Sequence, residues 1–174
     1  MRDDSHRWDA SISADMSADM SIVKDGLSIA AVALNRQTLI SGPAVLTQVE
    51  DQVVEWPGVA ASAAYTLCLR RDRVLVVNGP DVADGWDVEE QLAISDVSDA
   101  YRAFDLEGPH AMEVLNRGAE LSLTVPSRSV ARMLFGLGVL LYRVGAKNRF
   151  RIHVASAQAD ALWKSLQTAA RAVG

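Results

Sequence analysis

Three histidines are the residues in this sequence best suited to proton transfer. His6 lies among small and acidic residues near the N-terminus, and His110 follows a proline that is predicted to start a helix. His153 alternates with Ile152 and Val154, so it is predicted to point to the opposite face of their strand. This spacing predicts surface or helix-capping positions for His110 and His153 rather than general bases.

Cys68 is the only thiol, and it lies between Leu67 and Leu69 in a predicted strand. Nothing near it in the sequence lowers its pKa, so we predict an inert, small hydrophobic residue. A single cysteine also rules out an intramolecular disulfide and favours a reducing, cytoplasmic location. Known nucleophile, dinucleotide, phosphate-loop and zinc-protease motifs are absent from the sequence. The sequence therefore indicates no catalytic, cofactor-binding or metal-binding residue.

Five residues form weaker candidates for contacts with a partner. Arg143, Arg149 and Arg151 flank a predicted turn, and the last two share a strand face, where they could hold carboxylates or a phosphate. We favour a solvated hairpin face as their interpretation. Trp56 and Trp86 lie beside turn residues, as interface anchors often do. The alternative, which we favour for both, is that they cap the edge of their own core.

The composition describes a globular chain of 174 residues with a formal charge of −5. With 49% hydrophobic and 22% charged residues, it can bury a core, which excludes global disorder and a strongly basic nucleic-acid binder. No apolar run is long enough to cross a membrane. The net charge is −3 in residues 1–20, −5 in residues 21–94 and +3 in residues 95–174. This distribution favours two different faces, one of them for a partner.

The chain divides into an acidic tail and two similar parts. Residues 1–20 carry a tandem Ser-Ala-Asp-Met repeat and no apolar period, which predicts a flexible tail. The first unit, 21–94, is predicted to contain a strand over Leu27 to Leu34, punctuation at Ser41-Gly42-Pro43, and a helix through Leu46, Val49 and Val53. A hairpin of strands over Tyr65 to Leu69 and Val74 to Val77 and a short helix from Val88 to Leu92 complete it.

The second unit, 95–174, repeats this order. A strand over Tyr101 to Leu106 precedes Gly108-Pro109, and a helix with Ala111, Val114 and Leu115 follows. Strands over Val139 to Val144 and Phe150 to Val154 lead to a final helix whose apolar face is Ala159, Leu162, Trp163, Leu166, Ala169, Ala170 and Val173. The predicted fold is α+β, with two similar β-α-β-β-α units that arose by internal duplication and form one compact body.

Several short segments of the second half match a known family in order and spacing. They are Ser95-Asp96-Val97-Ser98, Phe104-Asp105-Leu106-Glu107-Gly108-Pro109, Ala111, Leu115, Gly118, Pro126, Ala131-Arg132, Phe150-Arg151, Val154, Ala161-Leu162-Trp163 and Leu166. With this pattern the chain resembles the gamma subunit of heterotetrameric sarcosine oxidases. Met133 departs from it, since the family pattern has a threonine there, and the acidic leader departs as well.

The resemblance implies the duplicated α/β fold of the folate-binding region of the glycine-cleavage T-protein. It also implies partners: alpha, beta and delta subunits, with this chain packing mainly on alpha. The family's NAD and tetrahydrofolate sites lie in alpha, FAD in beta, FMN between the two, and zinc in delta. No catalytic residue carries over to this chain, so it is expected to bind no cofactor itself.

The leading hypothesis is a non-catalytic, structural subunit of a sarcosine-oxidase-like complex. Such a complex would demethylate sarcosine or a related N-methyl amine to glycine, hydrogen peroxide and a one-carbon unit passed to tetrahydrofolate. The alternative is a stand-alone folate-binding protein of the aminomethyltransferase type. A third hypothesis is an interaction module unrelated to amine oxidation.

Overall fold

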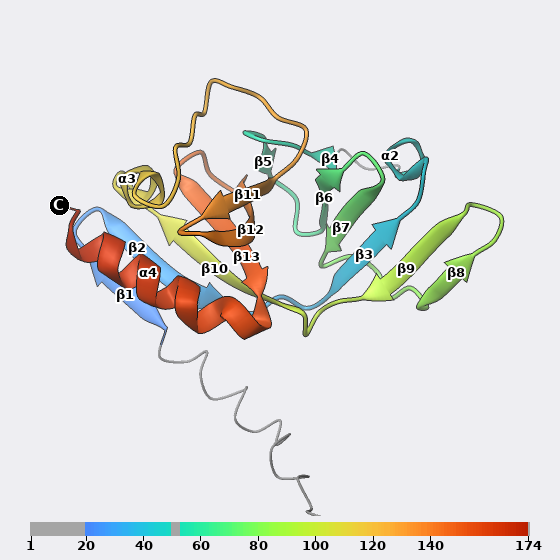
Figure 1. Ribbon diagram of the computed structural model, residues 1–174, viewed down its shortest axis with the longest axis horizontal. Helices are drawn as coiled ribbons and strands as arrows, with labels where there is room; N and C mark the ends of the chain where they lie inside the picture. The colour runs from blue at the N-terminus through green and yellow to red at the C-terminus, as the bar shows by residue number, and fades with distance from the viewer. Residues whose placement is uncertain (1–19, 50–52, 174) are drawn as a thin grey trace, which may run out of the picture.

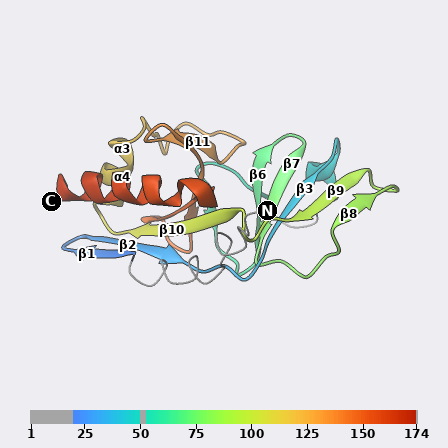
Figure 2. The same cartoon turned by 60° about the horizontal axis from the view of Figure 1, so that its bottom comes forward.

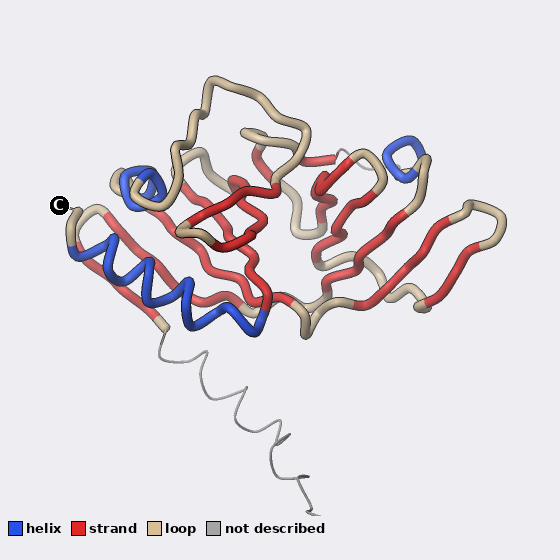
Figure 3. Tube along the Cα trace, in the orientation of Figure 1, coloured by secondary structure: helices blue, strands red, loops and turns tan. Residues whose placement is uncertain are grey.

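Two mainly antiparallel β-sheets, packed side by side, form the body of the protein in the computed structural model (Figure 1). The structure describes residues 20–49 and 53–173. The predicted flexible tail, apart from Met20, lies outside these residues. Strands account for most of the regular structure, and the helices are few (Figure 3). The predicted α+β class is therefore confirmed.

The larger sheet has seven strands and takes in both ends of the described chain. In spatial order it contains β1 (Ser21–Lys24), β2 (Leu27–Val32), β10 (Tyr101–Glu107), β13 (Arg149–Ala155), β12 (Leu137–Val144) and β11 (Ala131–Leu134), while β5 (Val59–Ala60) pairs with β12 in parallel.

The smaller sheet has six strands from the first half of the chain. In spatial order it contains β4 (Val53–Val54), β6 (Tyr65–Arg70), β7 (Arg73–Val77), β3 (Gln37–Ser41), β9 (Leu92–Asp96) and β8 (Gly85–Asp87). The predicted hairpin of β6 and β7 is confirmed, with Leu67 opposite Leu75.

The helices pack on the outer faces of the sheets. They are α2 (Val45–Gln48), α3 (Ala111–Asn116), the 3-10 turn η2 (Ser156–Gln158) and α4 (Ala159–Arg171). The final helix, α4, crosses the strands β1 and β2 (Figures 1 and 2). Every apolar residue of its predicted face is buried, which confirms the predicted amphipathic helix.

When the chain is divided between β7 and β8, each of the two parts lends a hairpin to the sheet of the other. The β1–β2 hairpin comes before β3 along the chain but pairs with β10, and the β8–β9 hairpin comes before β10 but pairs with β3. The strand orders β12-β13-β10-β2-β1 and β6-β7-β3-β9-β8 correspond element by element. The division at residues 94 and 95 therefore separates the larger sheet from its β1–β2 hairpin, and it leaves the whole smaller sheet except the end of β9 in the first unit.

The two Gly-Pro pairs mark the points where these exchanged hairpins touch the main body. A Cβ at Gly108, whose φ is +118°, would lie 2.3 Å from the Gly26 carbonyl oxygen in the β1–β2 turn. A Cβ at Gly42 would lie 2.6 Å from the carbonyl oxygen of Gln91 in the β8–β9 turn. Both contacts are too close for any side chain, so glycine is required at both positions.

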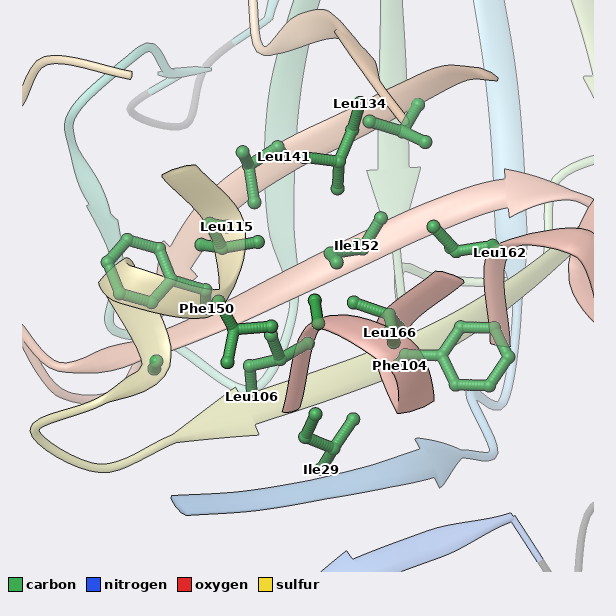
Figure 4. Close-up of a cluster of buried hydrophobic side chains, with 14 of the residues drawn as sticks. Ile29, Phe104, Leu106, Leu115, Leu134, Leu141, Phe150, Ile152, Leu162 and Leu166 are labelled. Atoms are coloured by element: carbon green, nitrogen blue, oxygen red, sulfur yellow. The ribbon is translucent and has the colours of Figure 1, made fainter. Parts of the chain in front are cut away.

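The main hydrophobic core lies between the larger sheet and its helices. Phe104, Leu106 and Ile152 point from β10 and β13 toward Leu162 and Leu166 of α4 (Figure 4). The Phe104 ring stacks on Trp163 with a centroid distance of 5.8 Å. A second core, which includes Leu67, Leu75, Leu140 and Tyr142, lies between the two sheets.

Two predicted helices of the first unit are wrong. In place of a helix from Val88 to Leu92, the chain makes the turn of the β8–β9 hairpin, because Asp87 Oδ1 accepts the N–H groups of Glu89 and Glu90, both at 3.0 Å. Gln91 then takes a left-handed φ of 55°, which reverses the chain.

The helix predicted through Leu46, Val49 and Val53 is a single turn. It ends after Gln48, and Val53 belongs to β4, which pairs in parallel with β6. Leu46, Val49 and Val53 have helical spacing by coincidence, because Val53 lies in a strand, β4, beside β6. The predicted strand from Leu27 is confirmed as β2, but the strand that runs directly into Gly42 is β3.

Candidate functional site

A chain of buried polar side chains crosses the boundary between the two sheets. From the larger sheet come Tyr142 on β12 and both Arg151 and His153 on β13; from the smaller sheet come Tyr65 on β6 and Gln37 on β3. Arg151 donates to the Tyr65 hydroxyl at 3.0 Å, and the two tyrosine hydroxyls lie 2.7 Å apart. Tyr142 Oη lies 2.7 Å from His153 Nε2, and His153 Nδ1 lies 2.7 Å from Gln37 Oε1.

One end of this chain is anchored by a carboxylate. Asp105 on β10 is 7% exposed and accepts Arg151 Nε at 2.6 Å and Arg151 Nη2 at 2.8 Å. Arg149 donates to the same carboxylate, with Nη2 2.6 Å from Oδ2. Such a forked pairing holds a buried guanidinium in one orientation. At the other end, the Gln37 amide donates to the Ser98 carbonyl at 3.2 Å.

The hydrogen bonds of the chain run in one direction. Gln37 uses its amide nitrogen to donate to Ser98, so its oxygen accepts from His153 Nδ1. With the proton on Nδ1, Nε2 of a neutral His153 accepts from the hydroxyl of Tyr142. Tyr142 then accepts from Tyr65, whose oxygen accepts from Arg151. The geometry thus fixes a single tautomer of His153.

Burial sets the protonation states along the chain. Burial, and then the charge of Arg151, lowers the pKa of His153 to about 3. Burial, together with the neighbouring Tyr65, raises the pKa of Tyr142 well above its usual value. Burial alone would lower the pKa of Arg151, but the hydrogen bond to Asp105 and the nearby charges raise it. At neutral pH, His153 is therefore uncharged and Tyr142 keeps its proton.

This network is better suited to holding the two sheets together than to transferring protons. A group that exchanges protons in catalysis works with a pKa near the operating pH, and those of His153 and Tyr142 are shifted away from it. Within the described residues, Gln48 Oε1 is the one buried side-chain polar atom without a hydrogen-bond partner. Every buried side-chain polar atom of the network therefore has a hydrogen-bond partner. A fully satisfied buried network fixes the relative position of the two sheets.

A cavity of about 390 Å³ opens beside Tyr65 of the network. Its lining includes Glu55, Trp56, Ser62 and Tyr65, from the segments around β4, β5 and β6. The Trp56 side chain is 3% exposed, and its Nε1 donates to the Ser122 carbonyl at 2.8 Å. This contact ties the cavity wall to the long loop between α3 and β11, which Figure 3 shows on the outside of the body.

The five predicted partner contacts lie in different environments. Arg151 belongs to the buried network, Arg149 shares its carboxylate while 39% exposed, and Arg143 donates through Nε to the Pro57 carbonyl at 2.7 Å. The solvated hairpin face is therefore wrong for Arg151. Trp56 is part of its own core, stacked under Arg132 at 5.4 Å. Trp86 on β8 is 60% exposed.

The predicted surface position of His153 is wrong, because its side chain is 0% exposed. It does point away from Ile152 and Val154, but that opposite face of β13 meets the smaller sheet instead of solvent. His110 is confirmed at the start of α3, where Nδ1 lies 3.2 Å from Glu113. Cys68 is confirmed as buried, and burial raises the pKa of its thiol.

The sequence pattern did not indicate the other members of the buried network. Gln37, Tyr65, Asp105 and Tyr142 come from four different strands and share no motif. The available signal was the alternation of polar and apolar residues in β10 and β13. That alternation was interpreted as exposure of one face to solvent.

Across residues 20–49 and 53–173, no three His, Cys, Asp or Glu side chains converge as metal ligands. No helix among these residues is long and apolar enough to cross a membrane.

No family model matches this chain, and no curated protein matches it. Among solved structures, the chain is similar to one in a crystal of the heterotetrameric sarcosine oxidase from Corynebacterium sp. U-96 in complex with pyrrole 2-carboxylate. The match has a TM-score of 0.66 and 21% sequence identity, and covers 92% of this chain and 91% of that chain. This chain has a sarcosine-oxidase-related fold. The predicted resemblance to these oxidases is thus confirmed for the fold, and the match to the gamma subunit in particular stays a prediction.

Proposed function

We propose that this chain is a structural subunit of a multi-chain amine oxidase, equivalent to the gamma subunit of heterotetrameric sarcosine oxidase. The observation that carries the proposal is the fold match, which spans about nine tenths of both chains, so the two are similar in length as well as in architecture. A match over about nine tenths of both chains supports equivalence of the two chains, rather than a shared domain with an unrelated role.

The buried network supports a structural role for the chain. Its titratable groups bind one another or other buried side chains: Arg151 binds Asp105, and His153 binds both Tyr142 and Gln37. A side chain held on all sides has no atom left for a substrate. We therefore assign oxidation of the amine, and the FAD, FMN, NAD, tetrahydrofolate and zinc sites, to partner subunits of the alpha, beta and delta types.

In this proposal the complex is cytoplasmic and converts sarcosine, or a related N-methyl amine, to glycine and hydrogen peroxide. The one-carbon unit passes to tetrahydrofolate. This chain packs mainly on the alpha-type subunit and stabilises the assembly. The opposite net charges of residues 21–94 and 95–174 support two distinct faces on its surface.

Co-expression with the alpha-, beta- and delta-type chains of the same organism tests this function. We expect a complex that contains this chain in equal proportion and produces hydrogen peroxide from sarcosine, with lower thermal stability when this chain is omitted. We also expect the chain expressed alone to be poorly soluble or to aggregate, except in dilute solution, and its partners to rescue it. A stable monomer that ignores these partners would contradict the proposal, and so would micromolar binding of tetrahydrofolate by the isolated chain in calorimetry.

A further inference from the structure

The β8–β9 hairpin extends beyond the rest of the body. It forms one end of the molecule, on the far side of the smaller sheet from α4 (Figures 1 and 2). Residues 81–91 are all exposed. Trp86 is 60% exposed and Val88 is 75% exposed, although both are large and apolar. Neighbouring apolar side chains of this kind mark an interaction surface when they lie together on one element.

The corresponding hairpin, β1–β2, is covered by a helix, whereas the β8–β9 hairpin is not covered by any helix of the described chain. The β1–β2 hairpin is covered by α4, and Lys24 Nζ donates to the Ala170 carbonyl at 3.0 Å at the end of that helix. Under this cover Leu27 is 3% and Ile29 is 0% exposed. Among the described residues no helix lies over β8 and β9, and Leu92, Ala93 and Ile94 are only half-buried.

The acidic charge of this hairpin indicates the charge of a surface that would bind to it. Residues 81–96 hold six acidic side chains and no basic one. Near the base of the hairpin, Arg36 pairs with Asp81 and lies 3.6 Å from Asp96. At the tip, Asp87, Glu89 and Glu90 are exposed and surround Trp86 and Val88 in sequence. An apolar anchor within an acidic rim is complementary to an apolar pocket bordered by Arg and Lys.

We propose that the β8–β9 hairpin is a docking arm for a partner protein whose surface carries an apolar pocket with a basic rim. Trp86 enters the pocket, Val88 packs beside it, and the carboxylates of the tip pair with the rim. The partner supplies the cover that α4 supplies to the β1–β2 hairpin. This inference rests on the proposed function, and it places the partner surface on another subunit of the oxidase-like complex.

The test compares variants in the co-expressed complex. Trp86→Ser with Val88→Ser removes the apolar anchor, and Glu89→Lys reverses a charge of the rim while keeping Glu90, whose Oε2 accepts from Gln48 Nε2 at 2.7 Å. Val125→Ser, 63% exposed elsewhere, is the matched apolar control, and Glu120→Lys is the matched charge control. We expect each arm variant to weaken binding of this chain to the remaining subunits by at least about tenfold, with both controls unchanged. Raising the salt concentration should shrink the effect of the charge reversal.

The possible outcomes distinguish failure of the docking arm from failure of the proposed function. A wild-type complex that the arm variants leave intact would overturn the docking arm while the proposed function stands. Failure of the wild-type chain to assemble would overturn the proposed function and the arm with it. A homodimer of this chain that Trp86→Ser dissociates would also overturn the inference, because the arm would then bind a second copy. Thermal melting of the isolated variants should match that of wild type, since the changed side chains are exposed.

Discussion

His153 Nδ1 lies 2.7 Å from Oε1 of Gln37, a residue 116 positions earlier that belongs to the other sheet. This bond makes a histidine part of the contact between the sheets, in a place without access to solvent. Its protonation state is therefore coupled to the stability of the whole body. That coupling can be measured.

Acidification should destabilise the protein through His153. Its pKa is about 3 in the folded chain against about 6.5 in an unfolded one, so between these values the unfolded state binds a proton that the folded state does not. The free energy of unfolding should then fall by about 1.4 kcal/mol per pH unit below pH 6.5 through this residue. Urea unfolding of wild type and His153→Asn checks this. The gap between the two should narrow by about 2 kcal/mol from pH 6.5 to 5, and a constant gap would contradict it.

Tyr142→Phe should break the polar chain at its centre. The change leaves the Tyr65 hydroxyl and Nε2 of His153 without their shared partner, at a cost of about 1–3 kcal/mol. Nitrogen NMR of the wild type should show His153 protonated on Nδ1 alone at pH 7. Protonation on Nε2 would mean that the hydrogen bonds run the other way. Tyr101→Phe is the control for the loss of stability in Tyr142→Phe, because the Tyr101 ring centroid lies 6.4 Å from that of His153.

Asp105→Asn should be among the most destabilising polar changes. It leaves the buried Arg151 without its carboxylate, and loss of one member of a buried pair costs about 3–5 kcal/mol. Glu107→Gln is the matched control, since Glu107 is 53% exposed and lies 3.9 Å from Arg149. We expect the control to change stability by less than about 0.5 kcal/mol in the same denaturation experiment. Equal effects of the two changes would argue against a buried anchor.

Gly108→Ala should loosen the β1–β2 hairpin. The new Cβ would lie 2.3 Å from the Gly26 carbonyl oxygen at a φ of +118°, so we expect a loss of about 2–4 kcal/mol. Gly145→Ala is the control, because Gly145 has a φ of +67° but nothing within 4 Å of its new Cβ. It should cost about 1 kcal/mol. Hydrogen exchange should localise the Gly108 effect to β1 and β2.

Cys68 should react slowly with thiol reagents in the folded protein. It is fully buried, and burial raises the pKa of its thiol, so little thiolate forms at neutral pH. The rate should rise by orders of magnitude in denaturant. Fast labelling under native conditions, with the fold intact by circular dichroism, would contradict this expectation.

The sequence predicted the elements better than their assembly. The final helix, the β6–β7 hairpin and the helix after Pro109 were all predicted, because each depends on local periodicity and turn residues. The β8–β9 hairpin was missed because its turn depends on the Asp87 carboxylate and a left-handed Gln91, which periodicity does not report.

The buried site was predicted hardly at all. Arg149 and Arg151 were correctly placed on one strand face, but that face was taken as solvated. An alternation of polar and apolar residues distinguishes the two faces of a strand without saying what lies against the polar one. Here it is a second sheet, whose pairing with the first depends on contacts more than 100 residues apart, such as that of Gln37 with His153.

The exchanged hairpins bear on how the chain could be divided. A fragment that ends at residue 80, between β7 and β8, would carry β1 and β2 without β10, and the complementary fragment would carry β8 and β9 without β3. Neither could complete its own sheet, but each holds the strands that the other needs. Two such fragments should therefore recognise each other and reconstitute the fold, and a half-length ancestor of this architecture would have been complete only as a symmetric dimer.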